Sequence, residues 1–138
     1  MENWEKINAV QRMQNYINEN IQNDISLHQL SQAAGYSPWH SGRIFKELLD
    51  KTPFEYIREL RLSKAALSLR DENPKVIDVA FDFVFDSHEG FTRAFSKQFG
   101  ISPNKYKKNT PPVKLFIPAD IRDYYRFLEK GDDSVKRI

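Results

Sequence analysis

The stretch Phe99-Gly100-Ile101-Ser102-Pro103-Asn104-Lys105-Tyr106 decides the fold, because its pattern repeats one that stands earlier in the chain. Four identical pairs recur at an offset of 50 positions, namely Arg43 with Arg93, Phe45 with Phe95, Pro53 with Pro103 and Tyr56 with Tyr106. Further upstream the offset is 49, which places Leu30 opposite Val79 and Tyr36 opposite Phe85. A repeat of this length indicates a duplicated structural unit. We therefore expect two similar subdomains within the 138 residues.

The first copy carries the signals of two short helices joined by a tight turn. Ser26 is a suitable N-cap for a helix that starts at Leu27, and Gly35 supplies the positive φ of a sharp turn. Ser37-Pro38 then opens a second helix that runs to about Leu49. Two short helices joined by a turn of roughly three or four residues with a glycine are typical of a helix-turn-helix motif.

The second copy and its neighbours are predicted to be helical as well. A helix is expected over residues 76–81, and Asp86 and Ser87 cap a second one that Gly100 ends. Between the copies a long connecting helix over residues 53–70 is expected to bury one stripe that includes Phe54, Ile57, Ala65 and Leu69. Residues 4–22 are expected to form a covering helix with Ile7, Val10, Gln14, Ile17 and Ile21 on its buried face.

The composition excludes several classes of protein. Hydrophobic residues make up 40% and charged residues 29% of the chain, the balance of a folded globular protein. The sequence has no apolar run of about 18 residues and no signal peptide, so we expect no membrane partner and a cytoplasmic location. The absence of cysteine excludes disulfides, cysteine-ligated metals and thiolate catalysis. No nucleophile and base pair, phosphate-binding glycine loop or metal set is visible, so we expect neither an enzyme nor a bound cofactor.

Charge is segregated along the chain although the net formal charge is only +2. Residues 71–89 contain one basic and six acidic residues, whereas residues 90–110 contain five basic and no acidic residues. This asymmetry suggests an anionic partner on one face, although two solvated helix faces would produce it too. Asp78, Asp82 and Asp86 recur every four residues. A solvated face is favoured for them over a metal site, because no histidine lies at ligand spacing; a surface for RNA polymerase is a further hypothesis.

A helix-turn-helix places its second helix in the major groove of DNA, where exposed side chains reach the base edges. The faces of the two second helices opposite their apolar residues carry Trp39, His40, Gly42, Arg43 and Lys46 in the first copy, and Ser87, His88, Glu89, Thr92, Arg93, Ser96 and Lys97 in the second. The repeated arginine is the most informative of these, because its planar guanidinium matches guanine O6 and N7. The alternative is an exposed arginine that pairs with a nearby acid.

Three other positions allow two interpretations each. Trp39 is either an exposed aromatic that packs on a thymine methyl or a half-buried core residue. Glu89 either accepts from cytosine N4 or stabilises the N-terminus of its helix through the helix dipole. Tyr56 and Tyr106 are expected to be core anchors rather than ligand contacts.

The sequence resembles the DNA-binding unit of the AraC-type (AraC/XylS) transcription regulators. The resemblance spans about residues 8–108 and rests on Leu30-x4-Gly35-Tyr36-Ser37, Phe45-Lys46, Val79-Ala80, Phe85-x5-Phe91-Thr92-Arg93-Ala94-Phe95 and Phe99-Gly100-Ile101-Ser102-Pro103-x2-Tyr106. It implies an all-α, homeodomain-like fold of about seven helices. The DNA-binding domain is then expected over residues 4–108, with a first helix-turn-helix subdomain over 4–52, the connecting helix over 53–70 and a second subdomain over 74–108.

The resemblance also assigns site residues. It implies base-reading roles for Trp39, Gly42, Arg43, His88, Glu89, Thr92 and Arg93. The basic run Lys105, Lys107 and Lys108 suits DNA phosphates, and further phosphate contacts are expected from Ser37, His40, Lys46, Ser87, Ser96, Lys97 and Asn104. One residue departs from the family pattern, because Val84 stands where a glycine is usual in the turn before Phe85. A β-branched residue suits positive φ poorly, so the turn is expected to be either rebuilt or strained.

These features predict a sequence-specific DNA-binding regulator, and in particular an activator that inserts two helices into adjacent major-groove segments of double-stranded DNA. The alternative is a helical protein-interaction module, or a fragment of an effector-responsive regulator, that reads DNA poorly. Residues 109–138 are expected to form a linker and an amphipathic helix with Ile121, Tyr124, Tyr125 and Leu128 on one side. This tail is too short for an effector pocket. It is expected to dock on the unit, on a second copy or on another subunit, so the chain acts as a monomer on DNA or as a weak dimer.

Overall fold

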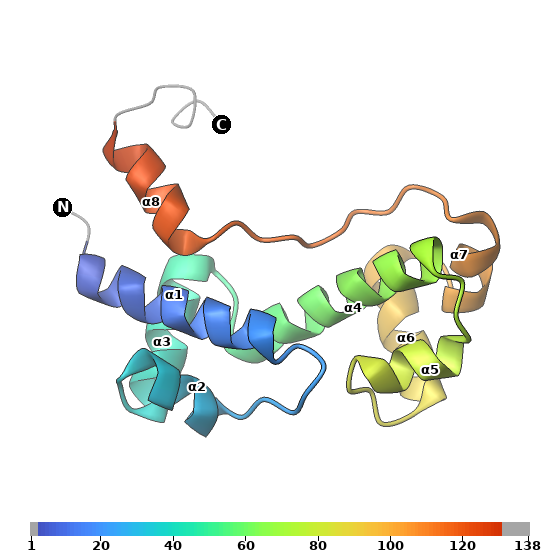
Figure 1. The fold of residues 1–138 in the computed structure, drawn as a ribbon, viewed down its shortest axis with the longest axis horizontal. Helices are drawn as coiled ribbons and strands as arrows, with labels where there is room; N and C mark the ends of the chain where they lie inside the picture. The colour runs from blue at the N-terminus through green and yellow to red at the C-terminus, as the bar shows by residue number, and fades with distance from the viewer. Residues whose placement is uncertain (1–2, 131–138) are drawn as a thin grey trace. The chain divides into compact units, whose positions relative to one another are not determined.

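The computed structural model describes residues 3–130 and is built from helices (Figure 1). Within these residues there are eight of them and no strand: α1 (Trp4–Glu19), α2 (Leu27–Ala34), α3 (Pro38–Leu49), α4 (Pro53–Asp71), α5 (Val76–Asp82), α6 (His88–Phe99), α7 (Pro103–Asn109) and α8 (Ile121–Glu129). The all-α class predicted from the sequence is confirmed. No helix between residues 3 and 130 combines the length and the apolar character that a membrane span requires.

The helices belong to two compact units. The first unit contains residues 3–20, 25–53 and 118–130, and therefore α1, α2, α3 and α8. The second unit contains residues 21–24 and 54–117, and therefore α5, α6, α7 and all of α4 beyond its first residue. Each unit holds one helix-turn-helix motif, α2–α3 in the first and α5–α6 in the second.

The helix ends follow the capping residues of the sequence. Ser26 accepts a hydrogen bond from the Gln29 backbone N–H at 3.1 Å, and the Gln29 side chain accepts from the Ser26 N–H at 2.9 Å, which completes a capping box at α2. Ser37 and Ser87 cap α3 and α6 through their hydroxyls. Gly100 ends α6 in the left-handed conformation with φ of 74°. The expected starts of the reading helices are therefore correct.

The core of the first unit is built around α1. Ile7, Val10, Met13 and Ile17 are buried on this helix, and α1 packs against both α2 and α3. The Arg12 guanidinium donates to the carbonyl oxygens of Ala33 at 3.0 Å and Ala34 at 2.7 Å. These carbonyls belong to the last turn of α2 and have no partner within the helix, so Arg12 fixes the point where the chain turns toward α3.

The core of the second unit is a chain of aromatic rings. Phe95 lies between Phe91, Phe99 and Tyr106, with ring centroids 5.6, 4.7 and 5.6 Å away. Edge-to-face and tilted pairs at these separations are favourable and fix the ring orientations. Tyr106 is buried here, and Tyr56 is buried on α4, as expected of core anchors.

The connecting helix α4 differs from the prediction. Phe54 is 51% exposed rather than part of a buried stripe, and the buried residues of α4 lie on several sides of the helix: Tyr56, Ile57, Leu60, Leu62, Ala65, Ala66 and Leu69. The physical reason is that two separate parts of the chain pack on different sides of α4. Part of the helix faces α5 and α6, and the extended segment after α7 covers another part, where Phe116 packs on Tyr56 and its N–H donates to the Ser63 hydroxyl at 2.8 Å.

The segment between α1 and α2 is tied to α4 by Arg61. The guanidinium of Arg61 donates to the carbonyls of Ile21 at 2.9 Å and Asn23 at 2.6 Å. Burial lowers the pKa of Arg61, and the nearby Asp24 carboxylate opposes this shift. A guanidinium keeps its charge even so, and its fixed fork of donors suits carbonyls presented by a loop.

In the turn of the second motif, Val84 adopts the positive φ that a glycine usually provides. Val84 has φ of 66°, and its N–H donates to Phe81 O at 3.1 Å while the Phe85 N–H donates to Ala80 O at 2.9 Å. Of the two expected outcomes, a rebuilt turn or a strained one, the structure shows the strained one.

The tail is an extended segment followed by α8. Val113 and Leu115 pack against the core of the second unit, and α8 packs on α1 in the first unit. On α8, Ile121 is buried and Tyr125 and Leu128 are half-buried, but Tyr124 is 48% exposed. The apolar side of α8 is therefore narrower than predicted.

Candidate nucleic-acid interface

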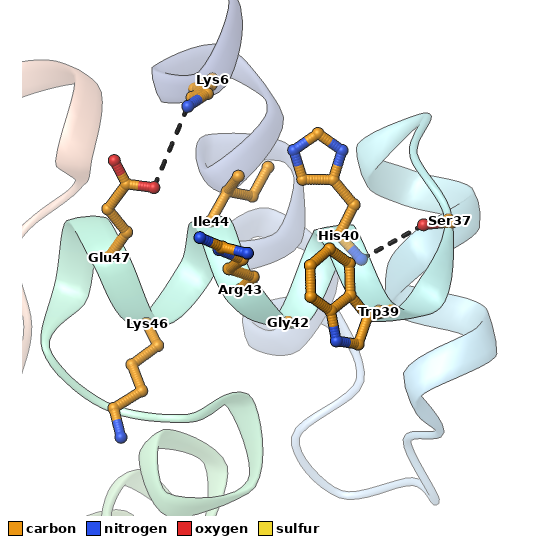
Figure 2. A pocket seen from close by; sticks show the side chains of 9 residues that line it. All are labelled: Lys6, Ser37, Trp39, His40, Gly42, Arg43, Ile44, Lys46 and Glu47. Carbon is orange, nitrogen blue, oxygen red and sulfur yellow. Dashed lines mark hydrogen bonds and ion pairs between the residues drawn. The ribbon is translucent and has the colours of Figure 1, made fainter.

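The first reading helix, α3, presents an aromatic ring and a guanidinium side by side. Trp39 is 70% exposed, which corrects the alternative of a half-buried core residue. The Arg43 guanidinium lies over the Trp39 ring, 5.1 Å from its centroid (Figure 2). A cation over an indole face is held by the ring quadrupole, and both groups remain open to solvent. The arrangement limits the conformations of Arg43 before any ligand arrives.

Ser37 and His40 flank this pair at the start of α3. The Ser37 hydroxyl oxygen accepts from the His40 backbone N–H at 3.2 Å and so caps α3. The same hydroxyl can still donate its proton to another acceptor. The His40 ring packs edge-on against Tyr36, with centroids 4.8 Å apart. Lys46 is exposed one turn beyond Arg43.

An open hollow of about 960 Å³ surrounds these side chains. It is lined by Lys6, Ser37, Trp39, His40, Gly42, Arg43, Ile44, Lys46 and Glu47 (Figure 2). Lys6 comes from α1 and lies 4.0 Å from the Glu47 carboxylate. The sequence interpretation missed Lys6 and Glu47. No local signal places Lys6 beside α3, because its position there depends on how α1 packs on that helix.

The second reading helix, α6, has a smaller hollow. It measures about 390 Å³ and is lined by His88, Glu89, Thr92 and Arg93. Ser87 accepts from the Gly90 N–H at 3.0 Å and so caps the helix on the same side. Glu89 lies in the first turn of α6, where a carboxylate is favoured by the helix dipole. Both interpretations of Glu89 therefore stay open.

The two hollows share equivalent positions of the repeat. At the offset of 50, Arg43 matches Arg93 and Gly42 matches Thr92. A Cβ at Gly42 would meet the Leu27 side chain at 3.8 Å, an ordinary contact, so the space beside Arg43 is open rather than closed by packing. The two helices thus offer the same arginine with different neighbours.

The other predicted contact residues lie around α6 and on α7. Lys97, Asn104, Lys105 and Lys108 are exposed, whereas Ser96 and Lys107 are half-buried. All of them belong to the second unit, together with the hollow on α6. The structure therefore groups these positions with the second reading helix and Ser37, His40 and Lys46 with the first.

The acidic residues occupy a different helix of the second unit. Asp78 and Asp82 are exposed on α5, and Asp86 is exposed in the following turn. Ile77 and Phe81, on the same helix, are 44% and 54% exposed. Across residues 3–130 the structure holds no cluster of three potential ligands that would accept a metal ion.

The fold and the two exposed second helices define a protein with two helix-turn-helix motifs. The sequence profile of the family described as "Helix-turn-helix domain" matches residues 30–109, more than half of the chain. The transcriptional activator AarP of Providencia stuartii is 38% identical over 92 residues, which cover 67% of this chain and 68% of AarP. The chain belongs to the AraC-type (AraC/XylS) family of helix-turn-helix transcription regulators.

Further comparisons agree with this assignment. The transcriptional regulator Rob of Salmonella typhimurium is 36% identical over 108 residues, and the chain spans only 37% of the length of Rob. An AraC-type DNA-binding domain structure from Chromobacterium violaceum matches with a TM-score of 0.71 at 22% identity, covering 80% of this chain and all of that one. The DNA-binding domain of AdpA, solved with a target DNA, matches with a TM-score of 0.69 at 22% identity, over 73% and 91% of the two chains. These structures share the fold.

Proposed function

We propose that this chain is a sequence-specific DNA-binding regulator of transcription that reads two segments of the major groove, one with α3 and one with α6. The observation that supports it best is the pair Arg43 and Arg93, which stand at the same position of two exposed second helices. A helix-turn-helix brings this part of its second helix to the base edges.

In this proposal the two arginines read guanines. A guanidinium donates two parallel hydrogen bonds to guanine O6 and N7, which discriminates by roughly 1–3 kcal/mol against other bases. Trp39 holds Arg43 and contacts a thymine methyl or a sugar. His88, Glu89 and Thr92 provide further polar contacts beside Arg93, whereas Gly42 leaves the corresponding space beside Arg43 without a side chain.

Contacts to phosphates position the protein on the duplex. The proposed phosphate contacts are Ser37, His40, Lys46, Ser87, Ser96, Lys97, Asn104, Lys105, Lys107 and Lys108. We add Lys6, because it lines the hollow around Arg43. Such contacts release counterions, so affinity falls steeply with salt whatever the sequence. They carry little sequence information directly.

We further propose that the regulator activates transcription, as the name of AarP states for that protein. We propose the exposed acids of α5 as a candidate surface for RNA polymerase, because their negative charge keeps this face away from the DNA phosphates. Binding to DNA as a monomer or weak dimer needs no catalytic group, and we propose no enzymatic activity. Because the relatives come from bacteria, whose DNA lies in the cytoplasm, we place the protein there.

A second candidate function rests on α5 as well. Ile77 and Phe81 expose apolar surface between acidic residues, which is the chemistry of a protein-binding face. A module that uses this face alone would bind a protein partner and would bind DNA weakly and without sequence preference.

A titration with two DNA duplexes separates the candidates. The purified chain is mixed at about 150 mM salt with a duplex selected from a random pool and with a scrambled duplex of equal composition. The proposal predicts an affinity ratio of about 10³ or more. Equal affinities for both duplexes would reject sequence reading and favour the protein-binding module.

A further inference from the structure

The helix α8 is capped by side chains of another helix. Its own N-cap residue, Asp120, makes no capping hydrogen bond through its side chain. Instead the Gln14 Oε1 accepts from the Ile121 N–H at 2.8 Å, and the Gln11 Oε1 accepts from the Arg122 N–H at 3.0 Å. The first N–H groups of a helix have no partner within it, and α1 supplies these partners from its side.

The same two glutamines are among the most buried polar residues of the protein. Gln11 is 2% exposed and Gln14 is 1% exposed. Gln14 Nε2 donates to the Ala119 carbonyl at 3.1 Å. The Gln14 amide therefore hydrogen-bonds the tail backbone on both sides of Asp120, at Ala119 and at Ile121. Each of these hydrogen bonds adds a modest net stabilisation to the docked state, because undocking exchanges the partners in the protein for partners in water. The glutamines therefore favour the docked tail.

The far end of the contact is held as well. The Trp4 indole N–H donates to the Glu129 carboxylate at 3.2 Å, which joins the start of α1 to the end of α8. Gln14, later in α1, binds the start of α8. Ile121 is 4% exposed and provides the apolar anchor. The two helices thus run antiparallel over most of the length of α8.

The helix that holds the tail also holds both parts of the first helix-turn-helix. Arg12 of α1 fixes the last carbonyls of α2, at the turn before α3. Lys6 of α1 lies beside Glu47 of α3, at the rim of the hollow around Arg43. A shift of α1 would therefore move the turn between α2 and α3, the reading helix α3 and the candidate phosphate contact Lys6 together.

We propose that residues 118–129 are a positioning element for DNA binding by the first unit: the docked tail fixes α1, and α1 fixes the turn and the reading helix α3. This inference rests on the proposed function. It assigns to the tail a role in reading the DNA segment that contacts α3, which is the first half of the site. It predicts that the second half, the segment that contacts α6, is read independently of the tail.

The test uses the full chain with the tail released from either side of the contact. Gln14→Leu keeps the volume of the side chain but leaves the Ile121 N–H and the Ala119 carbonyl without it. Ile121→Asp removes the apolar anchor and leaves α1 unchanged. Asn18→Ala, which removes an exposed amide from the same helix, is the control. Amide hydrogen exchange at Ile121 and Arg122 reports whether the tail is docked.

Binding is then measured on three duplexes: the selected site, the site with only its first half intact and the site with only its second half intact. Released tails should accelerate exchange at both amides and weaken binding to the first-half duplex by about tenfold or more, with second-half binding unchanged and Asn18→Ala like wild type. Released tails with unchanged first-half binding would overturn the inference, as would unchanged exchange in both variants. Failure of the proposed function looks different, because wild type itself would then prefer none of the duplexes.

Discussion

Gly35 and Val84 occupy the same left-handed backbone position in the two helix-turn-helix copies, with φ of 81° and 66°. At the offset of 49 they are equivalent in sequence, and each lies in the turn between the two helices of its motif. The turn geometry thus persists where the residue that suits it is absent. A β-branched side chain in this region costs roughly 1–2 kcal/mol, so the second motif carries strain that the first does not.

Exchanging these residues should change stability in opposite directions. Val84→Gly relieves the strain, which is partly offset by the greater freedom of glycine in the unfolded chain, and should stabilise the fold by about 0.5–1 kcal/mol. Gly35→Val introduces the same strain into the first motif and should cost at least about 1 kcal/mol. Chemical denaturation measures both. A destabilised Val84→Gly variant would show that the Val84 side chain contributes more packing than its backbone costs.

Gly42 should be replaceable by alanine with a gain in stability. The added Cβ meets only the Leu27 side chain, at 3.8 Å, and Gly42 lies inside α3 with ordinary helical geometry. Alanine is favoured over glycine in a helix interior by about 1 kcal/mol, so the melting temperature of Gly42→Ala should rise by a few degrees. A lower melting temperature would show that Leu27 cannot accommodate the methyl group.

Trp39 and Arg43 should contribute to DNA affinity as a coupled pair. Because the indole restrains the guanidinium, Trp39→Leu should weaken binding partly through Arg43. A double-mutant cycle with Trp39→Leu and Arg43→Ala is expected to give a coupling free energy of about 0.5–1 kcal/mol, the range of an exposed cation–π pair. Additive losses on the selected duplex would mean that the two side chains act separately.

The lysines of α7 should affect all DNA sequences alike. Lys107→Ala and Lys105→Ala each remove one proposed phosphate contact, so the slope of log K against log salt should become less negative by about 0.9 per contact. Sequence preference should not change, in contrast to Arg93→Ala. Lys75→Ala, a lysine beside the acidic residues of α5, serves as the control and should leave the slope unchanged.

Much of this fold could be predicted from local signals. The repeat, the serine caps and the glycines that end the helices placed α2 to α6 within a residue or two, because capping chemistry depends on neighbours in sequence. The burial of α4 could not be predicted in the same way. Its exposed Phe54 and its burial on several sides depend on the extended tail segment, which returns to it from over 50 positions away.

The candidate site shows the same division. Exposure of Arg43 followed from the spacing of Ile44 and Phe45 on one helix, whereas the same spacing allows Trp39 to be either exposed or half-buried. Lys6 was missed because its place beside α3 depends on how α1 packs. Gln14 was assigned to the buried face of α1, and only the structure shows that this amide binds the tail backbone. The apolar pattern of a single helix does not show which distant segments will pack against it.

In the proposed function both reading helices read DNA sequence, α3 through Arg43 and α6 through Arg93. The most direct measurement selects duplexes from a random pool with wild type, Arg43→Ala and Arg93→Ala, and compares the base preferences position by position. We predict a two-part site in which each variant loses preference for a guanine in a different part and keeps the other. Base preferences that are the same for all three proteins, or no selected site for wild type, would show that these arginines do not read the DNA sequence.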